Sequence, residues 1–269
     1  LFHFFLTYVY LMYLHGEMMN NFVFRFKKYF KMNKIRKNPI NKDFWENILK
    51  ENEIYYNGKS LFDWEDVFKY FTIDIRGKGN KLYLMSQVDS SPHKVTVDIS
   101  GDDHIFSIGA DNHINHPLYV GFYSACRKSS FGSSVIIGSG NKFNGDVSIS
   151  APITQGNKVQ IGNGNLFANS ISFHGNADHL IFDVETKERL NPESDIILEN
   201  NIWIGQEVRF LNKTYISSNS VIGMRSLVNR PFHEEYCLIA GSPAEVKKKG
   251  IMWSEALDDY YITQGNPLV

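Results

Sequence analysis

The sequence predicts an all-β protein whose short strands wind into a prism of stacked coils. Three observations predict this class. Apolar residues recur at intervals of six through the central part of the chain. From about residue 72, short β-rich pieces such as "VTVDI" and "IFSIG" alternate with Gly, Asn and Asp. No long helical pattern follows until the C-terminus.

The six-residue period carries the fold prediction. Helices repeat every 3.6 residues and strands every two, so a period of six fits neither. It fits a unit of one short strand and one corner, with the repeating residue pointing inward and three units closing one coil. A β-sandwich would not hold such a period. The predicted inward series are Phe131, Ile137, Phe143, Ile149, Ile161, Phe167 and Phe173, broken at Gln155, and then Leu198, Ile204, Phe210, Ile216, Ile222 and Val228.

We expect four segments along the chain. Residues 1–37 form an apolar and basic tail, and residues 38–71 a small cap with two short helices. The prism spans 72–246, and 247–269 form a C-terminal tail with a short helix at 253–262. That helix is expected to cover the open end of the prism, because an uncapped coil exposes unpaired strand edges.

The N-terminal segment "LFHFFLTYVYLMYL" (1–14) is too short to span a bilayer as a helix and lacks the features of a secretory signal. We expect upstream sequence before a start at Met18 or Met19. The alternative is a weak membrane-surface anchor, assisted by the basic segment 25–37.

Composition excludes some functions. The net charge is -1, from 28 basic and 29 acidic side chains, which argues against a nucleic-acid-binding protein. The two cysteines form neither a disulfide framework nor a metal-binding motif, so a reducing, cytoplasmic location is expected.

Three motifs carry a resemblance to a known family. The segments "IWIG" (202–205), "ISSNSVIGMRSLV" (216–228) and "CLIAGSPAEV" (237–246) resemble the hexapeptide-repeat acyltransferases. The resemblance is clearest over residues 173–253. It implies a left-handed parallel β-helix, a homotrimer, and acetyl-CoA as donor.

The segment 174–197 interrupts the period. Phe173 and Leu198 are 25 positions apart, which is not a multiple of six, so the chain leaves the prism there as a loop. Its sequence "DHLIFD" (178–183), followed by "KERLN" (187–191), resembles a motif of bacterial sugar O-acetyltransferases that act on sialic acid and capsular polysaccharide. That resemblance implies that His179 is the catalytic base and that Trp203 lines the active site.

The predicted chemistry is deprotonation of a sugar hydroxyl as it attacks a thioester. An imidazole with a pKa near 6.5 suits this step. Asp178 or Asp183 would orient the imidazole, although Asp183 could equally cap a turn. His174 is either a second active-site residue or an incidental loop histidine. Trp203 falls between the inward Ile202 and Ile204, so it should point outward.

The donor site is expected to involve small residues and basic groups. The resemblance places Gly205, Gly223 and Ser226 beside the pantetheine arm of acetyl-CoA. Lys247 and Lys248 could meet its phosphates or could form a solvated basic turn.

The sequence departs from the family at two places. Glu199-Asn200-Asn201 replace a common Gly-Asp-His, and Met224 and Arg225 replace smaller residues. A three-histidine zinc site from His104 and "HINH" (113–116) is a further alternative, but the ligand spacing does not match, and no metal is expected.

We therefore predict an acetyl-CoA-dependent O-acetyltransferase that acts on a sugar hydroxyl, with sialic acid or a surface polysaccharide as acceptor. Two alternatives stay open. One is an N-acetyltransferase of an amino sugar, and the other is a non-catalytic β-helix that binds glycan as a scaffold.

Overall fold

The computed structural model describes residues 42–88, 93–122, 130–153, 155–177 and 179–255. The chain divides into two compact units, 1–46 and 47–269. Helix α3 (Lys42–Glu51) crosses this boundary. The expectations for the N-terminal tail and for the helix at 253–262 lie outside the described residues, except that 253–255 are not helical.

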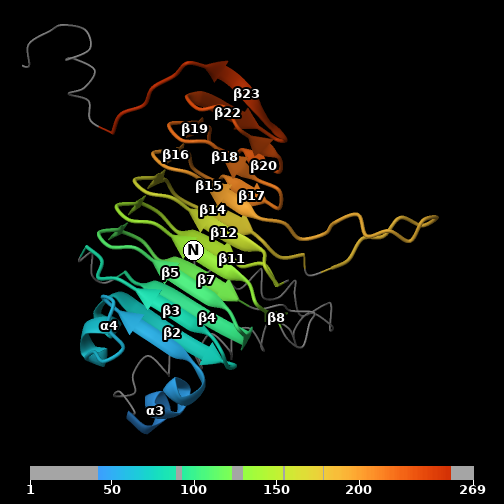
Figure 1. The fold of residues 1–269 in the computed structure, drawn as a ribbon. Helices are drawn as coiled ribbons and strands as arrows, with labels where there is room; N and C mark the ends of the chain where they lie inside the picture. The colour runs from blue at the N-terminus through green and yellow to red at the C-terminus, as the bar shows by residue number, and fades with distance from the viewer. Residues whose placement is uncertain (1–41, 89–92, 123–129, 154, 178, 256–269) are drawn as a thin grey trace, which may run out of the picture. The chain divides into compact units, whose positions relative to one another are not determined.

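The strands between Glu53 and Lys249 form a β-helix built from three mainly parallel sheets (Figure 1). The first, sheet A, contains in spatial order β1 (Glu53–Tyr56), β3 (Lys81–Leu84), β5 (Ile105–Ile108), β9 (Ser134–Ile137), β12 (Lys158–Ile161), β15 (Ile196–Leu198), β18 (Tyr215–Ile216) and β21 (Pro231–Phe232). Neighbouring strands in this sheet are parallel and lie one coil apart.

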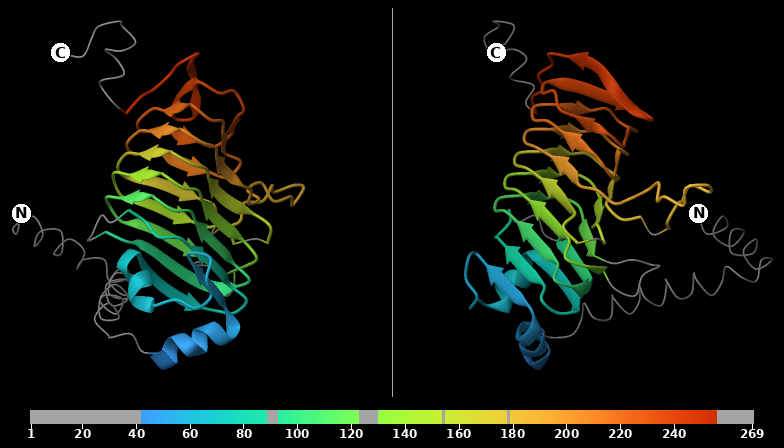
Figure 2. Two further views of the ribbon diagram at one scale, coloured as in Figure 1. Left: turned by 60° about the vertical axis from the view of Figure 1, so that its left-hand side comes forward. Right: turned by 45° about the vertical axis from the view of Figure 1, so that its right-hand side comes forward.

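The other two sheets complete the prism (Figure 2). Sheet B contains β2 (Phe71–Arg76), β4 (Val95–Asp102), β7 (Leu118–Phe122), β11 (Val147–Ser150), β14 (Ile171–His174), β17 (Arg209–Leu211) and β20 (Leu227–Val228), and β8 (Ser130–Phe131) pairs with β4. Sheet C contains β6 (His113–Ile114), β10 (Lys142–Phe143), β13 (Leu166–Phe167), β16 (Trp203–Ile204), β19 (Val221–Ile222), β22 (Cys237–Gly241) and β23 (Ala244–Lys249).

The coil length agrees with the predicted period. Ile204 pairs with Ile222 and Phe210 pairs with Val228, so one full coil spans 18 residues, or three units of six. The predicted inward residues of the second series are all fully buried. In the first series, Phe143 stacks on Phe167 with ring centroids 4.7 Å apart. The core is therefore a column of apolar side chains along the coil axis.

Phe131 is the exception in the inward series. It is 48% exposed, and the neighbouring Ser130 is buried instead. Strand β8 lies off the regular sheet path, beside the end of β4. There the Ser130 hydroxyl donates to the Ser100 carbonyl and contacts His104, so a polar group takes the inward place.

The cap and both ends of the prism differ from the predicted boundaries. The segment 38–71 contains α3 and α4 (Trp64–Tyr70), but β1 lies between them and pairs with β3. The β-helix therefore begins at Glu53, before residue 72. At the other end, β23 runs antiparallel to β22 and continues through Lys249, past residue 246. No helix in the described part of the chain is long and apolar enough to cross a membrane.

A ladder of buried asparagines holds the corner between sheets A and C. The Oδ1 atom of Asn112 accepts from the backbone N–H of Asn141, and Oδ1 of Asn141 accepts in turn from the N–H of Asn165, both at 2.9 Å. Their Nδ2 groups donate to corner carbonyls such as that of Gly162. Because buried backbone groups must be paired, these amides allow the chain to turn inside the protein.

Each coil also needs one left-handed residue at this corner. The positions with positive φ are Asp111, Gly140, Gly164, Asn201, Asn219 and Tyr236, one per coil. Gly, Asn and Asp tolerate this conformation best, which explains their frequency in the predicted turns.

Replacing one ladder asparagine should destabilise the fold. In Asn141→Ala, the N–H of Asn165 and the carbonyl of Gly162 lose their buried partner. We expect a loss of roughly 2–4 kcal/mol in the free energy of unfolding, measured by urea denaturation. The control, Asn144→Ala, removes an exposed asparagine from the same coil and should change stability by less than about 0.5 kcal/mol. Equal losses in the two variants would contradict the role of the ladder.

The buried His104 should make stability depend on pH. It is fully buried, and its two ring nitrogens each lie 3.0 Å from a serine hydroxyl, Ser133 and Ser130. Burial lowers the pKa of His104. The unfolded chain therefore takes up this proton first, near pH 6.5, and the stability present above that pH decreases as the pH falls.

We expect the wild-type free energy of unfolding to decrease between pH 7.5 and 5, by at most about 1.4 kcal/mol per pH unit from this group. His104→Asn should show a shallower decrease in the same denaturation series. A parallel decrease in both proteins would show that other groups cause the acid sensitivity.

Candidate active site

The interruption of the period is a projecting loop. Residues 175–195 connect β14 in sheet B to β15 in sheet A and extend away from the prism as a narrow ribbon (Figure 1). Phe182 and Arg189 form an isolated antiparallel bridge, and the Asp183 N–H donates to the Glu188 carbonyl at 2.9 Å. The loop that the interrupted six-residue period predicts is therefore an ordered hairpin.

Asp183 caps the turn of this hairpin. One carboxylate oxygen accepts from the backbone N–H groups of Glu185 and Thr186, both at 2.8 Å. The bond from Thr186, followed by the bond from Glu185, holds the pKa of Asp183 below its usual value. Of the two roles that the sequence left open for Asp183, capping is the one seen in the structure. Asp178 lies outside the described residues.

His179 lies exposed on the arm of the loop nearest β14. The side chain of Asn191 holds the backbone around it. Nδ2 of Asn191 donates to the His179 carbonyl, and its Oδ1 accepts from the Ile181 N–H, both at 2.8 Å. The sequence alone does not single out Asn191, although this residue ends the "KERLN" motif that carries part of the resemblance.

The loop exposes an unusual amount of apolar surface. The exposed fraction is 52% for Phe182 and 80% for Val184. Near its base, the Glu193 carboxylate is almost fully buried and lies 3.7 Å from the Arg189 guanidinium. Exposed apolar clusters mark sites of contact with other molecules. The other large apolar side chains exposed on the loop are Leu180, Ile181 and Leu190.

Trp203 points outward from β16, as predicted, and is 42% exposed. Its ring lies 6.3 Å from that of Trp253, whose Nε1 donates to the Asn201 carbonyl at 2.9 Å. Sheet C therefore presents an aromatic pair near the end of the described chain.

The structure does not bring His179 and Trp203 together within one chain. The loop leaves at the corner between sheets B and A, and in a three-sided prism that corner lies opposite sheet C, which carries Trp203. In Figure 1 the loop and β16 lie on opposite sides of the β-helix. A site that uses both residues therefore requires two chains.

Two adjoining hollows lie along sheet B and its corner with sheet C. One, of about 360 Å³, is lined by Glu207, Arg225, Ser226, Leu227 and Ser242 together with the shared residues Ser170 and Arg209. The other, of about 470 Å³, follows sheet B and includes Tyr119, Ser148, Ser172, His174 and Arg209. Arg209 belongs to both.

The residues predicted to bind acetyl-CoA differ in their burial and in their contacts. Ser226 is buried, and its hydroxyl donates to the Gly223 carbonyl at 2.6 Å. A Cβ atom on Gly205 would lie 2.7 Å from the backbone nitrogen of Met224, so this glycine permits close stacking of coils. Lys247 pairs with Glu245 at 3.1 Å, whereas the Lys248 side chain has no partner among the described residues.

His174 lies at the end of β14, partly buried in the larger hollow. Its Nε2 atom is 3.1 Å from the Ser172 hydroxyl. Burial, and secondly the nearby Arg209 charge, lower the pKa of His174, so it is neutral at physiological pH. The alternative that His174 is a second active-site residue stays a prediction.

The departures from the family motif have local structural roles. The Glu199 carboxylate accepts from the Tyr215 hydroxyl and from the Ser218 N–H, and the hydrogen bond from Tyr215 is the main reason that the pKa of Glu199 is lowered. Arg225 pairs with Glu207 at 2.9 Å on the rim of the smaller hollow. These side chains connect successive coils.

The histidines considered for a zinc site lie in different surroundings. His104 is buried between two serines, His113 points outward from β6, and His116 stacks on His93 with ring centroids 5.2 Å apart. No group of three or more His, Cys, Asp or Glu side chains among the described residues is placed to hold a metal ion.

Comparisons with known proteins show which proteins the chain resembles in sequence and in fold. No protein-family model matches the chain. It is 28% identical to a polysialic acid O-acetyltransferase of Escherichia coli O1:K1 over 46% of this chain and 39% of the relative, and 32% identical to one of Neisseria meningitidis over 42% and 51%. The crystal structure of the polysialic-acid-specific acetyltransferase NeuO covers 72% of this chain and 98% of its own, with 25% identity and a TM-score of 0.54.

The chain is therefore similar in sequence and in fold to polysialic acid O-acetyltransferases, which have the hexapeptide-repeat fold. Its fold is the left-handed parallel β-helix, which confirms the predicted fold class. The sequence match spans less than two thirds of the length of the curated relatives.

Proposed function

We propose that the chain is an O-acetyltransferase that moves an acetyl group from acetyl-CoA to a sugar hydroxyl, with sialic acid or a sialic-acid polymer as acceptor. The observation that carries this proposal is His179 on an ordered loop, held by Asn191, on a β-helix related to polysialic acid O-acetyltransferases. The cytoplasm is the proposed location, because acetyl-CoA is available there.

His179 would act as general base. The imidazole takes the proton of the sugar hydroxyl as that oxygen attacks the thioester carbonyl, and the C–S bond then breaks. The proton returns to the departing thiolate, so the enzyme ends unchanged. No covalent enzyme intermediate is needed, and the buried Cys237 is poorly suited to form one, since burial raises the pKa of its thiol.

A complete site would form between chains of a homotrimer. His179 and Trp203 lie on opposite sides of one prism, so His179 of one chain would meet Trp203 of its neighbour. The exposed apolar residues of the loop, such as Phe182, would be covered in the same assembly.

The donor would lie along the corner between sheets C and B. Gly205, Gly223 and Ser226 belong to this corner, and the smaller hollow opens there. Lys248 is a better candidate for a CoA phosphate than Lys247, because Lys247 is already paired with Glu245.

Removing the proposed base should abolish most activity without unfolding the protein. We expect His179→Ala to lower kcat by roughly 10²–10⁴-fold in acetyl transfer to a sialylated acceptor. The thermal midpoint should stay near that of wild type, since His179 is exposed. The control His233→Ala removes an exposed histidine at the end of sheet A and should keep kcat within a few-fold. Retention of activity in a folded His179→Ala protein would refute the proposed role.

Mixing two inactive variants should test the shared site. His179→Ala and Trp203→Ala chains, unfolded together and refolded as a 1:1 mixture, should recover about a quarter of wild-type activity if each site uses one residue from each chain. Each variant refolded alone is the control. No recovery in mixed trimers that form normally would place both residues in a site of one chain.

A further inference from the structure

The outer face of sheet B carries a continuous polar row. Thr96, Tyr119, Ser148, Ser172 and Arg209 are direct partners on five successive strands of this sheet. Each contributes a hydroxyl group until the row reaches Arg209, which brings a positive charge. The larger hollow, of about 470 Å³, lies over the last four positions of this row.

The corresponding row on sheet A has a different character. There the direct partners are Tyr83, Ser107, Ile136, Gln160 and Ile197, and Tyr83 stacks on Tyr55 with ring centroids 5.3 Å apart. The row on sheet A is interrupted by Ile136 and Ile197, whereas the row on sheet B is made entirely of hydrogen-bonding side chains, and its last four positions lie in a hollow.

Arg209 is a cation without a protein partner. Its guanidinium makes no hydrogen bond or ion pair with any described residue. Two carboxylates also line the hollows. Glu207 pairs with Arg225 at 2.9 Å, and Asp146 lies 3.9 Å from the His116 ring; neither forms an ion pair with Arg209. Lower on the same face, Asp98 pairs with Arg76 and accepts from the Tyr119 hydroxyl. The Arg209 charge is therefore available to a ligand in the hollow.

An unpaired guanidinium beside a row of hydroxyls suits an acidic sugar. The planar guanidinium group donates two parallel hydrogen bonds to a carboxylate, and these bonds are stronger than neutral ones. The hydroxyls of Ser148 and Ser172 can both donate to and accept from sugar hydroxyls.

We propose that Arg209 binds the carboxylate of an acidic sugar acceptor in the hollow on sheet B, and so selects acidic over neutral acceptors. This inference rests on the proposed acetyltransferase function. It adds the residue that binds the charged group of the acceptor. The same guanidinium could instead contact a phosphate of CoA, which is also anionic. The row of hydroxyls leading to Arg209 favours the sugar.

A binding experiment on the full chain tests this inference without relying on catalysis. Isothermal titration calorimetry would measure the Kd for three probes: a short sialic acid oligomer, the same oligomer with its carboxyl groups reduced to alcohols, and CoA. The proteins are wild type, Arg209→Gln, Arg209→Lys, and Lys59→Gln as a control. Lys59→Gln also removes one positive charge, from an exposed turn after β1.

We expect Arg209→Gln to weaken binding of the acidic oligomer by roughly 10- to 100-fold, the range for losing hydrogen bonds to a charged group. Arg209→Lys should fall between this variant and wild type, because lysine keeps the charge but loses the paired geometry. Wild type should bind the reduced oligomer as weakly as Arg209→Gln does. Lys59→Gln should bind like wild type, and CoA binding should be the same in all four proteins.

Two results would overturn the inference. One is equal binding of the acidic oligomer by folded Arg209→Gln and wild type. The other is loss of CoA affinity in Arg209→Gln with sugar binding unchanged, which would assign Arg209 to the donor. Should Arg209→Gln fail to fold, equal affinity of wild type for the acidic and reduced oligomers would refute the inference by itself.

The proposed function is judged by a separate measurement, CoA release from acetyl-CoA with the acidic oligomer present. Arg209-dependent binding without CoA release would refute the acetyltransferase proposal and leave the binding site standing. Acetyl transfer with a Km unchanged in Arg209→Gln would refute the role of Arg209 and leave the enzyme standing.

Discussion

The close stacking of coils at the prism corners is the constraint on which the rest of the structure depends. A chain that turns every six residues buries polar backbone at each corner, and those groups need partners. At the corner between sheets A and C, Asn112, Asn141 and Asn165 supply them, because each side chain accepts a hydrogen bond from the backbone of the next coil. Where the ladder ends, the inward position becomes the apolar Ile202, and hydroxyl side chains such as Ser220 serve the following corners.

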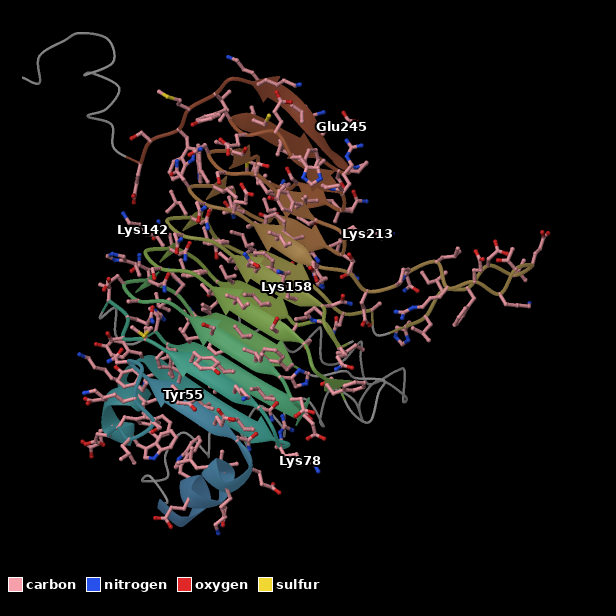
Figure 3. The ribbon with its side chains drawn as sticks, in the orientation of Figure 1. Tyr55, Lys78, Lys142, Lys158, Lys213 and Glu245 are labelled. Atoms are coloured by element: carbon pink, nitrogen blue, oxygen red, sulfur yellow. The ribbon has the colours of Figure 1, made fainter. Side chains whose placement is uncertain are left out.

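This rigid stack fixes where functional groups appear. Outward side chains in successive coils become direct neighbours, so residues far apart in sequence form continuous rows, as Ser172 and Arg209 do on sheet B. Figure 3 shows the side chains along the length of the β-helix. A loop inserted at one corner projects without disturbing the stack, because the strands on either side keep their register. The same geometry separates the loop from Trp203 by the width of the prism. Association of chains would bring the loop of one chain close to Trp203 of another.

The β-helix and the loop differ in what holds them. The prism is held by buried apolar columns and corner amides, whereas the loop depends on a few local hydrogen bonds from Asn191 and Asp183. The loop also leaves apolar side chains exposed. In addition, the buried carboxylate oxygens of Glu193 and two buried guanidinium nitrogens of Arg189 have no hydrogen-bond partner among the described residues. These features are expected of a segment that is completed by contact with another molecule.

The sequence by itself determined the coil, its length, and the existence of the loop, because the inward positions obey a local, repeating rule that is visible along the chain. It also predicted the outward direction of Trp203. Tertiary structure alone decided that Asp183 caps a turn, that Ser130 replaces Phe131 in the core, and that Arg209 stands unpaired in a hollow. The physical reason is that outward and corner positions follow no period, and their partners come from coils that only winding brings together.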